Sequence, residues 1–234
     1  MTRFLLLLAL AVTVTACDTT DPNEVDLTVQ VASDIAADPG VRDPTTGQVA
    51  DTDRFTLYSL RENRIIVNYD DDARADSAST AWDIGFRGSE IIVNGGTSGP
   101  GAGVAVVVEA PFAGVVDARN AAYTYRRDGE SACPDVQTPA GPVPGPRRAV
   151  CGGSGNGWYT YVPFPGGRGG YLLPTPGRTL LVRLADNSGY AKVNFLSYYQ
   201  GAPEASAITD RSQDRYYSFE YIVTDSSGSF VEEV

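Results

Sequence analysis

Residues 179–199 read TLLVRLADNSGYAKVNFLSYY, and residues 216–223 read YYSFEYIV. Both stretches are rich in β-branched and aromatic residues, and Asp-Asn-Ser-Gly at 186–189 is a typical turn sequence between two strands. In the second stretch Tyr217, Phe219 and Tyr221 occupy every second position, which is the period of a β-strand. The two stretches therefore predict an antiparallel meander near the C-terminal end of the chain.

Working outward from this meander, the rest of the chain carries the same strand signals. Residues 55–60 (FTLYSL) and 65–67 (IIV) predict a hairpin. In residues 82–87 (WDIGFR), Trp82, Ile84 and Phe86 are expected to share one buried face of a strand. Residues 104–108 (VAVVV) are apolar throughout, which predicts a central strand buried on both faces. Because no apolar stripe with helical period exceeds two turns, we expect one all-β domain.

The N-terminal segment has the features of a bacterial lipoprotein signal. Its apolar run, residues 4–14, is about 11 residues long, whereas a membrane-spanning helix needs roughly 20. Val-Thr-Ala-Cys at 14–17 forms a lipobox, so we expect residues 1–16 to be cleaved and Cys17 to carry acyl chains such as palmitate. Residues 17–24 then form a flexible tether, and residues 25–234 form the folded domain.

The three cysteines divide into one lipid site and one pair. With Cys17 assigned to the anchor, Cys133 and Cys151 remain, and an exported chain lies in an oxidising compartment where they would form a disulfide. The alternative is a two-cysteine metal or redox site, but the pair lacks CxxC spacing and has no histidine partner.

Composition excludes several classes of function. The net charge of −11 argues against nucleic acid as a partner. The sequence contains no histidine, which removes Ser-His-Asp and Cys-His catalysis and imidazole-bound zinc, so we expect neither an enzyme nor a metal site. The acidic residues 70–77 lack the EF-hand pattern and predict a solvated loop. The Gly-rich segments 94–103, 152–157 and 163–170 predict surface loops, where ligand contacts would lie.

Several segments resemble those of the HmuY-like haem-binding lipoproteins. They are residues 55–60 and 82–87, residues 91–101 (IIVNGGTSGPG), residues 190–201 (YAKVNFLSYYQG) and residues 217–221 (YSFEY). The resemblance spans about residues 50–225, and the segment between Cys133 and Cys151 has no counterpart in it. It implies a single all-β, antiparallel domain of the HmuY type on a lipid anchor. Such a protein would lie at the outer membrane, on its periplasmic or cell-surface face, and would capture haem and pass it to a TonB-dependent receptor.

The sequence departs from this family at the haem iron. Members of the family hold the iron between histidines or methionines, whereas this chain has no histidine and its one methionine is Met1. We therefore assign no axial ligand. Haem could be bound through a tyrosinate, or by apolar contacts with an arginine pairing a propionate, for which Arg87, Arg126 and Arg127 are the candidates. The alternative function is an envelope interaction or structural protein that keeps the fold without binding haem.

Overall fold

A computed structural model describes residues 27–231, apart from 44, 47, 131, 139–140 and 167–168. The expected signal peptide (1–16), Cys17 and the whole of the expected tether (17–24) lie outside the described residues. Strands dominate the described part, which confirms the all-β prediction, and its helical turns are three short 3-10 segments. These are η1 (Ala75–Ala78), η2 (Phe112–Gly114) and η3 (Ala205–Ala207). Within the described residues, no helix has the length and apolar character needed to cross a membrane.

The C-terminal meander forms most of a five-stranded antiparallel sheet. Its spatial order is β1 (Gln30–Ala36), β15 (Asp214–Asp225), β14 (Gly189–Tyr199), β13 (Thr179–Arg183) and β8 (Val104–Val108). The pairings of β13 with β14 and of β14 with β15 confirm the predicted meander. The strand at 104–108 is an edge strand, however, and not the predicted central strand. Ala105 and Val108 are buried, whereas Val104, Val106 and Val107 are only partly buried.

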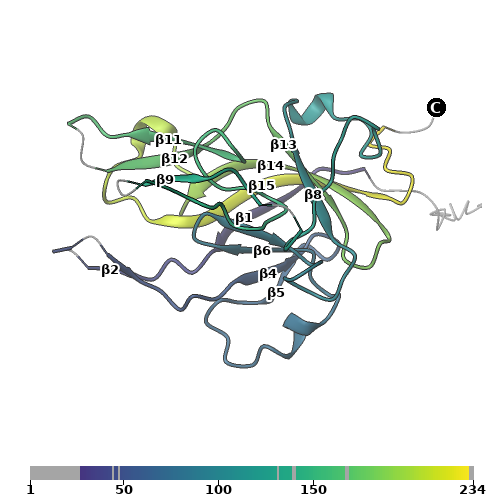
Figure 1. Cartoon of the computed structure of the whole chain (residues 1–234), viewed down its shortest axis with the longest axis horizontal. Helices are drawn as coiled ribbons and strands as arrows, with labels where there is room; N and C mark the ends of the chain where they lie inside the picture. Colours follow the sequence, from purple (N-terminus) through teal and green to yellow (C-terminus); the bar gives the residue numbers. More distant parts are fainter. Residues whose placement is uncertain are drawn as a thin grey trace, which may run out of the picture.

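A four-stranded antiparallel sheet packs against one face of the first. Its order is β5 (Arg64–Val67), β4 (Thr56–Ser59), β6 (Ile84–Arg87) and β7 (Glu90–Val93). The predicted hairpin is confirmed, because β4 pairs antiparallel with β5. Figure 1 shows the layers, with β13, β14 and β15 above and β4, β5 and β6 below.

The main hydrophobic core lies between these two sheets. Alternate residues of β15, among them Tyr217, Phe219 and Tyr221, are fully buried there, as the two-residue period predicted. The ring of Phe86 on β6 lies 4.5 Å from that of Tyr217, centroid to centroid. Trp82 does not share this face with Phe86, so that part of the prediction was wrong: β6 begins only at Ile84, and Trp82 packs with a cluster on the opposite side of the small sheet.

The outer face of the large sheet carries a second core. Loops covering β8, β13 and the end of β15 bury Val115, Leu181 and Phe230, and Leu27 packs against them. Lys192, the only lysine in the sequence, is buried beneath this cover. Its Nζ donates hydrogen bonds to the carbonyl oxygens of Phe112 (3.2 Å) and Val115 (3.0 Å).

Three two-stranded hairpins extend toward one end of the molecule, on the left in Figure 1. They pair β2 (Val41–Arg42) with β3 (Val49–Ala50), β9 (Val136–Thr138) with β10 (Gly141–Val143), and β11 (Tyr159–Pro163) with β12 (Gly170–Pro174). The β9–β10 hairpin lies within the loop closed by the disulfide between Cys133 and Cys151, whose Cα atoms are 5.4 Å apart. The predicted disulfide is therefore confirmed.

Candidate ligand-binding cleft

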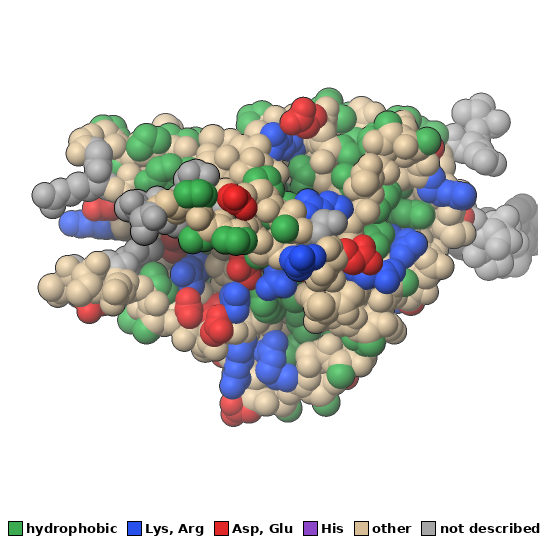
Figure 2. Space-filling view, viewed as in Figure 1, with side chains coloured by type: hydrophobic (Ala, Val, Ile, Leu, Met, Phe, Trp, Pro, Cys, Tyr) green, Lys and Arg blue, Asp and Glu red, His purple; other side chains and the backbone are tan. Residues whose placement is uncertain are grey.

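A cleft of about 850 Å³ opens at the end of the molecule where the β2–β3 hairpin projects. One wall is formed by residues around this hairpin and by Tyr69, which follows β5. The opposite wall is formed by residues 210–214 and Tyr216, where β15 begins. Figure 2 shows the hollow at the left end of the molecule. The volume lies within the range of about 300–1,000 Å³ that small-molecule sites occupy.

The hairpin wall is held by a buried carboxylate and by the backbone conformation of a glycine. The fully buried Asp38 accepts hydrogen bonds from the amide of Thr52 (2.9 Å) and from that of Arg54 (3.3 Å), which joins the two legs of the hairpin. Gly40 has a φ of +61°, and a Cβ there would lie 2.5 Å from the carbonyl oxygen of Ala50. A glycine is needed at this position because only it combines that conformation with so close an approach.

The opposite wall is a tight turn leading into β15. The hydroxyl of Ser212 accepts a hydrogen bond from the amide of Thr209 (3.0 Å), and the amide of Ser212 donates to the carbonyl of Thr209 (3.1 Å). This turn places Arg211 on the wall of the cleft between Asp210 and Asp214. The wall therefore carries charges of both signs.

Two phenol groups line the cleft, those of Tyr69 and Tyr216. Partial burial raises the pKa of Tyr69 above its ordinary value, and the nearby charge of Asp70 acts in the same direction. Tyr69 therefore stays protonated at neutral pH. On the hairpin, Asp43 accepts hydrogen bonds from the amides of Thr45 and Thr46, which lower the pKa of its carboxyl group. Chemically, the cleft offers phenol oxygens, aromatic faces, carboxylates and one guanidinium.

The three arginines considered for propionate binding lie outside this cleft and are engaged elsewhere. Arg87 pairs with Asp53 and with Glu90 (2.8 Å). Arg126 donates from Nη1 to Sγ of Cys151 (3.0 Å) and from Nη2 to the carbonyl of Ala132 (2.9 Å). The Nε atom of Arg127 is 4.0 Å from the carboxylate of Glu130. Their assignment to a propionate stays a prediction.

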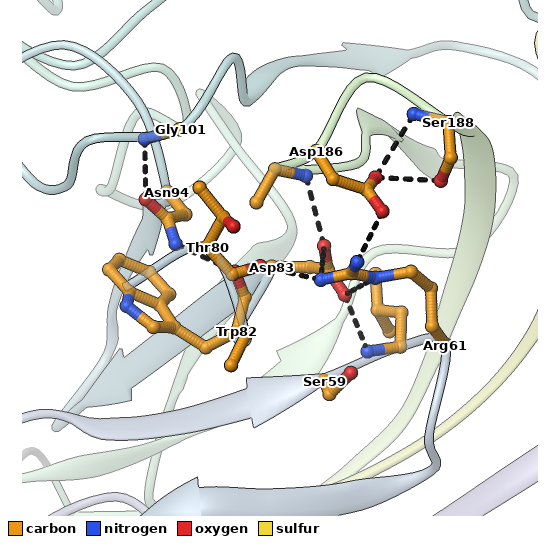
Figure 3. Close-up of polar contacts among 12 residues, drawn as sticks. Ser59, Arg61, Thr80, Trp82, Asp83, Asn94, Gly101, Asp186 and Ser188 are labelled. Atoms are coloured by element: carbon orange, nitrogen blue, oxygen red, sulfur yellow. Dashed lines mark hydrogen bonds and ion pairs between the residues drawn. The ribbon is translucent and has the colours of Figure 1, made fainter. Parts of the chain in front are cut away.

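The Gly-rich segment 94–103 folds onto the molecule and does not line the cleft. Asn94 donates from Nδ2 to the carbonyls of Ser79 and Trp82 (both 2.8 Å), and its Oδ1 accepts from the amide of Gly101 (2.9 Å) (Figure 3). A Cβ at Gly99 would lie 2.2 Å from Oδ1 of Asn94. Gly99, Gly101 and Gly103 are thus explained by close packing around Asn94, whereas Gly95 and Gly96 approach the carbonyls of Gly103 and Asp128.

Asp83, which lies in residues 82–87, is also a structural residue. Its buried carboxylate accepts from the amides of Leu60 and Ala185 (both 3.0 Å) and pairs with Arg61, which reaches on to Asp186 (Figure 3). Burial raises the pKa of Asp83, while the two amides and Arg61 oppose that rise. This junction joins the turn after β4, the start of β6 and the turn after β13. Its carboxylate oxygens face partners within the fold, so the junction is not a ligand site.

The fold and cleft together describe a class: an antiparallel two-sheet β protein with an open cleft at one end. No family model matches the chain, and no curated protein matches its sequence. Among solved structures the chain is similar to the crystal structure of the Tannerella forsythia apo HmuY analog (TFO), with 16% sequence identity and a TM-score of 0.41. The similarity covers 84% of this chain and 96% of that one.

The sequence interpretation missed the residues that line the cleft. Tyr69 and Tyr216 are 147 positions apart; Tyr69 lies outside the predicted strands, and Tyr216 begins the predicted strand 216–223, where nothing marks it as a cleft residue. Pro39-Gly40 was the one local signal, because such a pair marks a turn near which a hairpin can begin. Only the folded arrangement brings that turn opposite residues 210–216.

Proposed function

We propose that this protein is a lipid-anchored binding protein of the bacterial outer membrane that holds haem, or a related tetrapyrrole, in the cleft at its β2–β3 end. The observation that carries the proposal is the cleft itself, about 850 Å³ in volume and lined by two tyrosines and an arginine. The family resemblance of residues 50–225 supplies the ligand class. A TonB-dependent receptor would be the partner that receives the ligand.

The cleft chemistry fits a phenolate-bound ferric iron. Among protein side chains tyrosinate is an established haem ligand, and Tyr69 and Tyr216 are the candidates within the cleft. Because the pKa of Tyr69 is raised, coordination through it would release a proton, and affinity would increase with pH. The carboxylates of Asp43, Asp210 and Asp214 would repel the propionates, whereas Arg211 on the same wall could pair with one of them.

The position of the cleft also suits a tethered binding protein. β15 runs from the cleft at Asp214 to Asp225, and its 12 residues span roughly 36 Å. Leu27, where the described chain begins, packs with Ile222 and Phe230 near the far end of that strand. A tether leading to Cys17 would thus leave the domain at the end opposite the cleft, and the cleft would open away from the membrane.

Haemin titration of the chain lacking residues 1–17 tests the proposal. We expect a saturable shift of the Soret band with one haemin per chain, tighter at higher pH, and a loss of that shift in Tyr69→Phe or Tyr216→Phe. Tyr161→Phe is the matched control, because Tyr161 is 44% exposed on β11 and does not line the cleft. No spectral change up to about tens of micromolar haemin would refute haem binding, since that range covers micromolar affinities.

A second candidate is an envelope interaction protein that binds no haem. The three aspartates that line the cleft favour it, because they disfavour an anionic ligand. Titration with iron-free protoporphyrin, beside haemin, distinguishes the two proposed functions. Binding of haemin without binding of protoporphyrin indicates iron coordination. Binding of neither ligand favours the interaction protein.

A further inference from the structure

Arg215 lies where the two walls of the cleft meet, immediately before Tyr216 on β15. Its φ is +66°, in the left-handed region that side chains with a Cβ rarely adopt. Such a conformation costs on the order of 1–3 kcal/mol and persists only where the surroundings fix it. The carbonyl of Arg215 accepts a hydrogen bond from the amide of Ala37 (2.8 Å), which ties its backbone to the end of β1.

The side chain of Arg215 reaches both legs of the opposite wall. Nη1 donates to the carbonyl of Asp38 (2.8 Å), before β2, and to the carboxylate of Asp51 (2.8 Å), after β3. The side chain is 20% exposed, so solvent screens this ion pair less than it screens a pair on the open surface. The guanidinium also packs beside Gly88 in the β6–β7 turn, where a Cβ would lie 3.9 Å from it.

Among the described residues of the hairpin beyond these contacts, none is fully buried. Val41 is 75% exposed, and the described residues between it and Ala50 are exposed or half-buried. Within that described part, the hydrogen bonds of the hairpin join its own residues, as between the Asp43 amide and the Gln48 carbonyl (2.7 Å). The direction of the hairpin is therefore set at its base, by Asp38, by Arg87 acting on Asp53, and by Arg215.

We propose that Arg215 is a positioning residue that sets the opening of the cleft by holding both legs of the β2–β3 hairpin against the start of β15. Arg215 is a side chain of the opposite wall that contacts both legs of the hairpin, so its loss would let the hairpin move away from residues 210–216. Its importance for ligand retention depends on the proposed function, but its effect on the hairpin does not.

The test measures the width of the cleft without ligand. Nitroxide labels at Gln48→Cys and Gln213→Cys report the distance between the walls by pulsed electron resonance, with the Cys133–Cys151 disulfide kept oxidised. We expect one narrow distance distribution in the parent, a longer and broader one in Arg215→Met, and an intermediate one in Arg215→Lys, which keeps the charge. Arg64→Met is the matched control, because Arg64 is 58% exposed and pairs with Glu62 on another hairpin.

A second arm uses haemin. If the parent binds it, Arg215→Met should speed haemin dissociation by about tenfold or more, because the charge-assisted hydrogen bond to Asp51 that holds the hairpin in place is lost. If the parent does not bind haemin, the proposed function fails while the distance measurement still decides the role of Arg215. An unchanged distance distribution in folded Arg215→Met overturns the inference. Should that variant not fold, Asp51→Asn, which removes only the ion pair, must broaden the distribution or the inference fails.

Discussion

Replacing both members of the disulfide, Cys133→Ala with Cys151→Ala, should destabilise the domain by about 3 kcal/mol. The bond joins residues 18 positions apart, and the chain-entropy relation for a loop of that size gives about 3 kcal/mol at 25 °C. Both cysteines are buried, at 5% and 7% exposure, so the small cavities left by the sulfur atoms add to this loss. For a domain of this length we expect the melting temperature to fall by roughly 6–12 °C.

The assay is urea unfolding followed by the fluorescence of Trp82 and Trp158, both buried in the folded chain. The matched comparison is the parent treated with a reductant under native conditions. Because Cys133 and Cys151 are buried, the disulfide should stay intact until the domain opens. A loss below about 1 kcal/mol in the double variant would refute the loop-entropy reasoning. Hydrogen exchange adds a local check, since amides of the β9–β10 hairpin should exchange faster in the variant than those of β14.

Three further changes test particular contacts. Gly99→Ala places a methyl group 2.2 Å from Asn94 Oδ1 and should lower the unfolding free energy by about 1–3 kcal/mol. In the control Gly152→Ala the Cβ would lie 4.0 Å from the hydroxyl of Tyr159, so the unfolding free energy should change by less than about 0.5 kcal/mol. Equal effects would contradict the packing argument. Burial lowers the pKa of Lys192 below 10.5. The stability of the parent relative to Lys192→Met should therefore rise with pH between the lowered pKa and 10.5, and should stay constant below the lowered pKa. A constant difference in denaturation midpoints across this window would argue against the burial of a charged amine. Tyr217→Phe leaves the half-buried carbonyl of Gly88 without its 3.0 Å hydrogen bond and should lower the unfolding free energy by about 0.5–1.5 kcal/mol in urea melts. No loss would mean that water replaces the hydroxyl.

The strand pattern was predictable where local alternation and tertiary burial coincide. Tyr217, Phe219 and Tyr221 alternate along one strand, and all three are fully buried on one face. The β4–β5 hairpin and the disulfide also follow from local composition and from cysteine arithmetic. In each case the physical signal lies within a few neighbouring residues or in the number of cysteines.

The remaining features depend on which layers meet. Trp82 sits two residues before Ile84, yet β6 begins only at Ile84, so the alternation did not extend to the tryptophan. Residues 104–108 are apolar enough for a central strand, but whether a strand has one neighbour or two is decided by the whole sheet. The cleft residues Tyr69 and Tyr216 become neighbours only through β5 and β15. The local strand pattern includes Tyr216 but does not mark it as a cleft residue, and it does not include Tyr69.

The burial of Lys192 determines how contacts of this domain can be mapped. Because the only lysine is 4% exposed and lies near the rings of Phe112 and Phe230, amine-directed cross-linkers and labels meet no lysine at the surface of the folded domain. The sequence instead offers 29 acidic side chains. Carbodiimide coupling through Asp and Glu is therefore the cross-linking chemistry suited to a search for a partner protein, and lysine reactivity becomes a specific reporter of unfolding.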